Sequence, residues 1–194
     1  MAVTIPGPDT HFHGVHFYDD APEWCRTVAR FIVDGLRRHE ATVAIVTPLH
    51  HALIVENLLA AEVSERDLLN TQSLQLLDAG DTLGLFMRDE GPDRELFHLH
   101  MGGLVRAATE ARSPARIRAY GEMVDLLSQQ GRHEDAVQLE TLWNELASTV
   151  EMSLLCGYAM CSFPKGIPPT EALVQHTHML SPNGDFTPVP VPTA

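Results

Sequence analysis

Hydrophobic positions along the chain alternate between two spacings, one typical of buried strands and one typical of helices. Short apolar runs such as ATVAIVTP at 41–48 are typical of strands buried on both faces. Between these runs, apolar residues recur every three or four positions, which predicts amphipathic helices. The predicted strands cover residues 13–18, 41–48, 73–79, 116–123 and 152–160. The predicted helices cover residues 22–38, 49–61, 81–87, 93–112, 133–150 and 170–179, with a further helical turn after 123.

Strands that alternate with helices predict an α/β fold, because parallel neighbours must be joined by crossovers. We expect a three-layer α/β/α sandwich with a mainly parallel sheet. The 194 residues suit one domain, which we assign to residues 13–180. Residues 1–12 are expected to form a flexible arm. The proline-rich residues 181–194 are expected to form an extended or disordered arm, or the remnant of a linker.

The charge balance narrows the classes of partner. Asp and Glu number 26 against 13 Lys and Arg, giving a net charge of -13, which opposes binding to nucleic acid or anionic membranes. Three cysteines are too few for a disulfide scaffold and indicate a reducing compartment. The N-terminal residues lack the pattern of a signal peptide, and no apolar run is long enough for a membrane span. We therefore expect a cytoplasmic protein.

Several catalytic motifs are missing from the sequence. A nucleotide-hydrolysing sandwich needs a glycine-rich loop that ends in Gly-Lys-Ser/Thr, and the only lysine, Lys165, lies in SFPKGI. The patterns Gly-x-Gly-x-x-Gly, Gly-x-Ser-x-Gly, His-Glu-x-x-His and Cys-x-x-Cys are also absent. These absences favour a role other than catalysis.

In open parallel sheets, ligands bind beyond the carboxyl ends of the strands. The residues to examine are therefore those that follow each predicted strand: Tyr18 to Asp20, Thr47 to His50, Asp78, Gly121 to Met123, and Gly157 to Met160. Glu122 stands out because it directly follows the strand RIRAYG. Its carboxylate could act as a base or metal-binding acid, or it could cap the amides of the next helix.

Two pairs of polar or soft side chains occupy alternating strand positions. His16 and Tyr18 share one face of the first strand, and Cys156 and Tyr158 share one face of the fifth. Each pair is either a satisfied core network or part of a pocket, since buried polar groups need partners. For Cys156 alone, an inert buried thiol is favoured. Together, the two strands predict a largely apolar pocket with a few polar anchors.

Three His-x-His pairs occur among the 11 histidines: His11/His13, His98/His100 and His176/His178. Residues two apart share a face in extended backbone, so the first pair could chelate a metal. The second pair lies in a predicted helix, where such residues point about 200° apart. The third pair lies where the last predicted helix ends, which leaves both geometries open. Solvated or capping histidines are favoured over a metal site, because no ligand spacing is completed.

The predicted helix 133–150 carries two further candidates. Trp143 lies in the apolar stripe and is favoured as a core residue over a ligand platform. Glu140 lies beside that stripe, one turn from Trp143 and Asn144.

The order of these pieces is similar to that of a known family. HGVHFYDD, VAIVTPLHH, LQLLDAGDTLGLFM, RIRAYGEMVDLL, LETLWNEL, SLLCGY and HTHM together resemble the MEDS family, over about residues 13–180. The resemblance implies a RecA-like sandwich that has lost the phosphate-binding loop. It also implies a sensory input module for small organic molecules, in a family that often precedes kinase-type or anti-sigma-type ATPase domains. The family supplies no catalytic assignment.

The expected ligand-binding residues combine the strand-edge argument with the family motifs: His16, Tyr18, Glu122, Trp143, Cys156, Tyr158, His176 and His178. The favoured function is a ligand-sensing regulatory domain that signals to a separate kinase-type or anti-sigma-type partner. One alternative is a metal- or cofactor-binding protein or enzyme that uses Glu122 with these histidines. Another is a pure interaction module, in which the fold serves only as a docking surface, for example between two copies of the chain in a homodimer. The acids near the expected crevice favour a neutral, cationic or metal-bound ligand over a phosphorylated one. The sequence identifies no cofactor.

Overall fold

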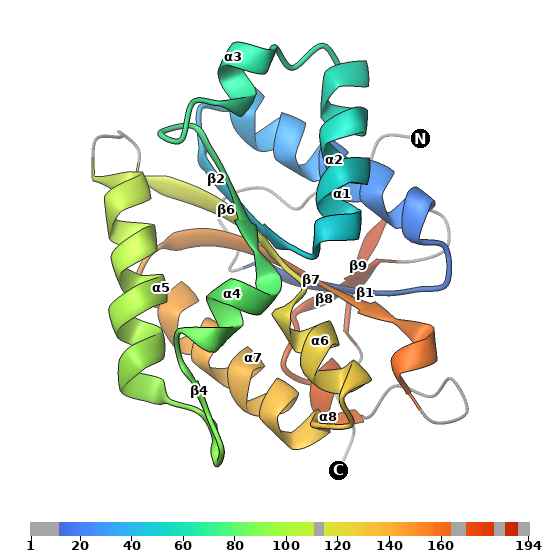
Figure 1. Cartoon of the computed structure of the whole chain (residues 1–194), viewed down its shortest axis with the longest axis vertical. Coiled ribbons are helices and arrows are strands. Elements are labelled where there is room, and N and C mark those ends of the chain that lie inside the picture. Colours follow the sequence, from blue (N-terminus) through green and yellow to red (C-terminus); the bar gives the residue numbers. More distant parts are fainter. Residues whose placement is uncertain (1–11, 111–114, 164–169, 181–184, 190–194) are drawn as a thin grey trace.

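The computed structural model describes residues 12–110, 115–163, 170–180 and 185–189, and it shows a central sheet between two layers of helices (Figure 1). The strands of the sheet are β1 (Phe12–Tyr18), β2 (Ala41–Val46), β3 (Leu74–Asp78), β6 (Arg116–Gly121), β7 (Glu151–Ala159), β8 (His178–Leu180) and β9 (Phe186–Pro188). Their order is β3-β2-β6-β7-β1-β8-β9, and all neighbouring pairs are parallel except β8 and β9. The expected α/β sandwich with a mainly parallel sheet is confirmed.

The helices are α1 (Ala21–Arg37), α2 (Pro48–Ala60), α3 (Glu65–Leu68), α4 (Ala79–Gly84), α5 (Arg94–Thr109), α6 (Met123–Gln129), α7 (His133–Ala147) and α8 (Thr170–Leu173), with a 3-10 turn at Met160–Ser162. A two-residue ribbon, β4 (Met87–Arg88) and β5 (Gly91–Pro92), precedes α5. Within the described ranges, no helix combines the length and the apolar character that crossing a membrane requires.

Two hydrophobic cores fill the space between the layers. Helices α1 and α2 pack on one face of the sheet, and α4 to α8 pack on the other. All six residues of β2 are buried, as expected of a central parallel strand covered on both sides.

The sequence determines the start of α1 through local interactions. The Asp20 side chain accepts a hydrogen bond from the Glu23 amide at 2.7 Å, and Pro22 lies in the first turn. Trp24, Val28 and Ile32 then recur at helical spacing on the buried face. These interactions fix where α1 leaves β1 and place Trp24 against the sheet.

The C-terminal part of the chain differs from the expected secondary structure. The helix predicted for 170–179 is wrong beyond Leu173, because residues 178–180 form β8. This strand pairs with β1 at Gly14 and Val15, and β9 then pairs with β8. The backbone groups on that edge of β1 thereby gain partners, which outweighs the weak helical pattern of a short segment. Within the tail expected at 181–194, the structure describes residues 185–189, and within the arm expected at 1–12 it describes Phe12.

At two places in the sheet, the segments that follow two neighbouring strands pack on opposite faces. Helices α1 and α2 follow β1 and β2 on one face, whereas α6 follows β6 on the other. The chain after β7 also packs on the face of α6, through Phe163 and α8. Crevices at the carboxyl ends of the strands are therefore expected between β2 and β6 and between β7 and β1.

Candidate functional site

The register between β1 and β7 separates the predicted site residues onto opposite faces of the sheet. His16 lies opposite Gly157, and Phe17 lies opposite Tyr158. Directly opposed residues share a face, so His16 and Tyr18 project toward α1. Cys156 and Tyr158 project toward α7, where both belong to the other core. The structure therefore does not bring the eight predicted residues into one pocket.

A pocket of about 530 Å³ lies on the α1 side, at the carboxyl end of β1. His16 and Tyr18 line this pocket, as do the start of α1 and the strand β8. The lining residues are His16, Phe17, Tyr18, Asp19, Asp20, Glu23, Trp24, Thr27, Met179 and Leu180. The His16 ring stacks on the Trp24 indole with 4.8 Å between ring centroids. The pocket thus combines an aromatic wall with three carboxylates.

A glycine lets the Trp24 indole lie close against the sheet. A Cβ atom at Gly157 would lie 2.5 Å from Trp24 Nε1, which is too close for any side chain at this position. The same indole N–H donates to the Tyr120 hydroxyl at 2.8 Å, and Tyr120 donates to Glu122 Oε1 at 2.8 Å. The pocket wall is therefore linked by hydrogen bonds to Glu122.

Glu122 directly follows β6 at the carboxyl edge of the sheet, as the sequence predicts, and it is only 1% exposed. The structure adds that this position lies at the divergence between β2 and β6. Its Oε2 accepts the Thr47 amide at 2.8 Å, and its Oε1 accepts from His50 Nδ1 at 2.7 Å and from Tyr120. Glu122 does not cap α6, which has no side-chain cap, and instead binds the amide that precedes α2. This pattern is that of a satisfied buried carboxylate connecting two strands.

His50 gives this network a pH dependence that can be measured. The hydrogen bond to Glu122 raises the pKa of His50 above its usual 6.5, although burial acts in the opposite direction. A raised folded-state pKa stabilises the protein fully below pH 6.5, and this contribution is lost as the pH rises through the folded-state value. We expect His50→Gln to cost about 1.5–3 kcal/mol below that pH and progressively less above it.

Urea unfolding of the wild type and His50→Gln across a pH series measures this difference. His51→Gln is the matched control, because His51 is the next residue of α2 and is exposed. The free energy of unfolding of His51→Gln should change with pH as that of the wild type does. A stability difference for His50→Gln that grows with pH would contradict the assignment.

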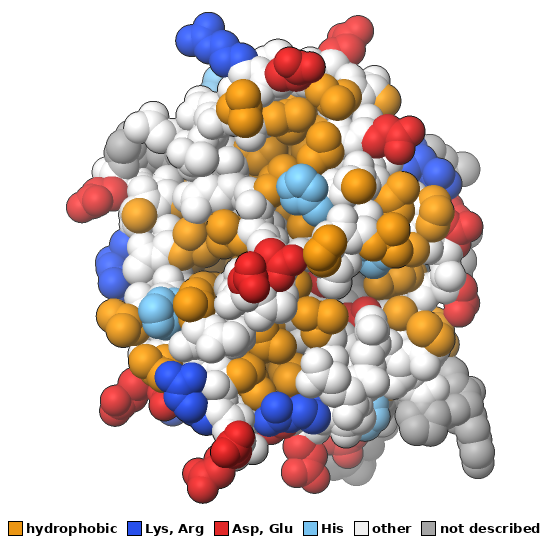
Figure 2. Space-filling model, viewed as in Figure 1, with side chains coloured by type: hydrophobic (Ala, Val, Ile, Leu, Met, Phe, Trp, Pro, Cys, Tyr) orange, Lys and Arg blue, Asp and Glu red, His pale blue; other side chains and the backbone are white. Residues whose placement is uncertain are grey.

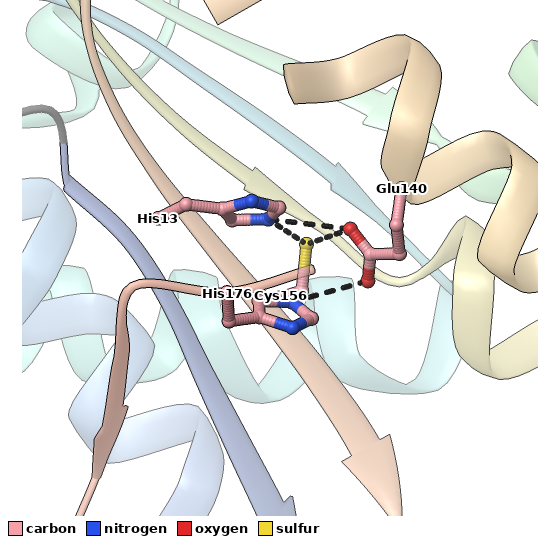
Figure 3. A group of neighbouring side chains, drawn as sticks. All are labelled: His13, Glu140, Cys156 and His176. Atoms are coloured by element: carbon pink, nitrogen blue, oxygen red, sulfur yellow. Dashed lines mark hydrogen bonds and ion pairs between the residues drawn. The ribbon is translucent and has the colours of Figure 1, made fainter. Parts of the chain in front are cut away.

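A second group of polar side chains is completely buried on the α7 side. His13 of β1, Glu140 of α7, Cys156 of β7 and His176, which follows α8, each place a donor atom within 4.8 Å of the others (Figure 3). His13 Nε2 lies 3.2 Å from Glu140 Oε2 and 3.4 Å from Cys156 Sγ. Cys156 Sγ lies 3.4 Å from Glu140 Oε2, and His176 Nε2 lies 3.2 Å from Glu140 Oε1. We call these four residues the buried cluster.

The electrostatics of the buried cluster follow from its burial. Burial alone would raise the pKa of the Glu140 carboxyl, but the rings of His176 and His13 lower it well below its usual range. Burial and Glu140 raise the pKa of the Cys156 thiol well above its usual value. Burial and His176 lower the pKa of His13. The cluster therefore holds a buried carboxylate beside a thiol.

His13 lies between Cys156 and Asn144, as a histidine base lies between a cysteine nucleophile and an orienting amide in some enzymes. Asn144 Oδ1 lies 2.9 Å from His13 Nδ1. A nucleophilic cysteine, however, needs a lowered pKa and an accessible sulfur. Cys156 is 1% exposed and its thiol pKa is raised. The geometry therefore fits a buried binding centre better than a nucleophile.

Of the remaining predicted residues, Tyr158 donates its hydroxyl hydrogen to Glu140 Oε1 at 2.8 Å, whereas Trp143 and His178 have separate surroundings. Trp143 is buried against Phe97, with ring centroids 5.1 Å apart, as expected of a core residue. His178 lies in β8, where its ring lies 5.3 Å from that of Phe12. Neither contributes to the pocket or the buried cluster. His11, the candidate partner of His13, lies outside the described residues.

Sequence reasoning did not join His13 and Glu140 to this site. Glu140 carried a usable signal, because it lies beside the apolar stripe of its helix, and the structure shows that it is fully buried. A carboxylate at such a position needs a buried partner. His13 was considered only as a possible metal-chelating partner of His11, and nothing in the sequence placed it beside Glu140.

Comparison with known families agrees with the motif order. The model of the family described as MEDS, "MEthanogen/methylotroph, DcmR Sensory domain", matches residues 12–168. A search of curated proteins found no match.

Proposed function

The chain belongs to the MEDS family of sensory domains, and on this basis we propose that it is a ligand-sensing regulatory domain. The proposed ligand is a small organic molecule that binds in the pocket beside β1. The observation that carries this proposal is the position of the pocket. It lies at the carboxyl end of β1, next to the divergence between β7 and β1, where sheets of this class bind ligands.

The lining of the pocket favours a neutral or cationic ligand. Asp19, Asp20 and Glu23 contribute negative charge, and the described residues that line the pocket include neither lysine nor arginine. Trp24 and Tyr18 offer aromatic surfaces, which attract organic cations as well as apolar groups. Figure 2 shows lysine and arginine side chains scattered over one face of the molecule rather than gathered into a patch. An anionic ligand would have little to neutralise it.

A route for the signal leads from the pocket to α2. The hydrogen bonds from Trp24 through Tyr120 to Glu122 continue to His50 and to the Thr47 amide. A ligand that displaces the indole would alter the packing at the start of α2. We propose that a kinase-type or anti-sigma-type partner in the cytoplasm senses this change. A reducing compartment agrees with the three unpaired cysteines, Cys25, Cys156 and Cys161.

Filling the pocket tests this function. We expect Thr27→Trp to abolish the ligand-dependent rise in Tm, because Thr27 lies in α1 and lines the pocket. Differential scanning fluorimetry should be run with methylammonium ions, short alcohols and carboxylates of matched size. The cations or alcohols should raise the Tm of the wild type, and the carboxylates should not.

Thr141→Trp is the matched control for that experiment. Like Thr27, Thr141 is a helical threonine that hydrogen-bonds the carbonyl four residues before it, but it lies on α7. The control should keep the ligand response. Stabilisation by carboxylates alone, or an equal response in both variants, would reject the pocket as the sensory site.

A further inference from the structure

We propose that His13, Glu140, Cys156 and His176 bind one divalent transition-metal ion, with Zn²⁺ as the ion that fits best. These residues supply two imidazole nitrogens, one sulfur and one carboxylate oxygen. Such a mixed set suits borderline-soft ions and not Ca²⁺ or Mg²⁺, which prefer oxygen ligands alone. The site lies on the opposite face of the sheet from the sensory pocket, so this inference goes beyond the proposed function.

The donor spacing matches a tetrahedral ion. In a tetrahedron, two ligands are separated by about 1.6 times the metal–ligand distance, or about 3.3–3.7 Å for Zn²⁺. His13 Nε2, Cys156 Sγ and Glu140 Oε2 form a triangle with sides of 3.2, 3.4 and 3.4 Å. This triangle has the size of one face of the tetrahedron. His176, which offers a ring nitrogen within 4.8 Å of the other donors, supplies the fourth corner (Figure 3).

Both histidine rings are oriented by a hydrogen bond at Nδ1. His176 Nδ1 lies 2.8 Å from the Ala172 carbonyl, which only accepts, so Nδ1 must carry the proton. The Asn144 amide donates its Nδ2 hydrogen to the Gln175 carbonyl at 2.9 Å, which turns Oδ1 toward His13 Nδ1. When each ring is neutral, as metal binding requires, its bare Nε2 lone pair faces the cluster. Metal-binding histidines are typically held in this way.

One ring nitrogen of the buried cluster lacks a hydrogen-bond partner among the described residues. Within the described part of the chain, His176 Nε2 is completely buried and has no hydrogen-bond partner. It faces Glu140 Oε1 at 3.2 Å, so a lone pair opposes a carboxylate oxygen. A cation bound in the cluster would give this lone pair a partner and would balance the charge of the carboxylate.

The charge balance also favours a divalent ion. Glu140 is 0% exposed, and its ion-pair partners in the described ranges are both histidines. One carboxylate and one metal-bound thiolate each carry a single negative charge, so together they balance the charge of a divalent cation. The Tyr158 hydroxyl donates to Glu140 Oε1 at 2.8 Å, but it leaves the negative charge of the carboxylate in the core, and a bound cation would balance that charge. With four protein ligands the site is closed, which indicates a structural role linking β1, β7, α7 and the segment after α8.

Metal titration of the full chain tests this inference. Protein treated with a chelator and then dialysed should bind one equivalent of Zn²⁺ by calorimetry, and the Tm should rise. Co²⁺ should give thiolate-to-metal charge-transfer absorption with the same stoichiometry. Cys156→Ser should remove that absorption. His176→Gln should weaken Zn²⁺ binding by at least about 100-fold, because losing a ligand exceeds the effect of losing an orienting residue.

Two matched controls separate coordination from general damage. Cys25→Ser alters another buried thiol, on the α1 side, and should keep the Co²⁺ absorption. His178→Gln alters a histidine two residues from His176 and should keep the Zn²⁺ affinity. Circular dichroism identifies any variant that fails to fold, and His176→Gln then serves in place of Cys156→Ser. The inference is overturned if the folded wild type binds neither ion saturably, or if the controls lose binding as the cluster variants do.

Discussion

Arg118→Leu is expected to lower the free energy of unfolding by about 3–5 kcal/mol. Arg118 is 2% exposed in the centre of the sheet. Its Nε donates to Glu40 Oε2 at 2.8 Å, and its Nη1 donates to the Phe31 carbonyl at 3.1 Å and to Asp34 Oδ2 at 3.0 Å. The guanidinium also lies 4.9 Å from the centroid of the Phe31 ring. Leucine would leave the nearly buried Glu40 carboxylate and a carbonyl without these partners.

Urea unfolding measures this loss, and the same strand provides its control. Arg116 of β6 pairs with Glu151 at 2.6 Å, but both side chains are partly exposed. Arg116→Leu should therefore cost no more than about 1 kcal/mol. The double variant Arg118→Leu/Glu40→Leu should recover part of the loss, because it also removes the stranded charge. Equal losses for Arg116→Leu and Arg118→Leu would show that burial does not determine the effect.

Gly157→Ala is expected to cost about 1–3 kcal/mol and to weaken ligand binding in the sensory pocket. The new Cβ would lie 2.5 Å from Trp24 Nε1 and 2.9 Å from Trp24 Cε2, and a rigid indole cannot bend away as a flexible chain would. The ring must shift as a unit. That shift would stretch its hydrogen bond to Tyr120 and move the wall of the pocket.

Gly121→Ala is the control for this substitution. Gly121 ends β6 in the same sheet, and a Cβ there would meet no atom within 4 Å. It should therefore be neutral, or stabilise by up to about 1 kcal/mol through the unfolded chain. Thermal unfolding compares the two variants, and near-ultraviolet circular dichroism reports the environments of Trp24 and Trp143, of which Trp24 is the one against residue 157. An unchanged tryptophan signal in Gly157→Ala would refute the steric argument.

Much of the fold is predictable because its determinants are local. The β-branched run in β2 and the apolar periodicity of α7 each identify an element from neighbouring residues alone. The family motifs add the order of the elements. The short C-terminal strands were not predicted, because β8 exists through its pairing with Gly14 and Val15, which are distant in sequence.

The site was harder to predict, because its geometry depends on strand register. His16 and Cys156 look equivalent in the sequence, yet the pairing of His16 with Gly157 places them on opposite faces. A shift of one residue in the register between β1 and β7 would have placed both side chains on the same face. The buried cluster likewise unites residues far apart in the chain, such as His13 and Cys156, 143 positions apart. Their residue types are visible in the sequence, but their convergence is a property of the folded sheet.

The outermost strand has a consequence for how the protein behaves at high concentration. An exposed strand edge can recruit a strand from another molecule and so begin aggregation. β9 pairs with β8 on one side and ends at Pro188, whose nitrogen carries no hydrogen for a further ladder. The proline that looked like part of a linker in the sequence thus limits the growth of the sheet at this edge and helps to keep separate copies of the chain from joining their sheets.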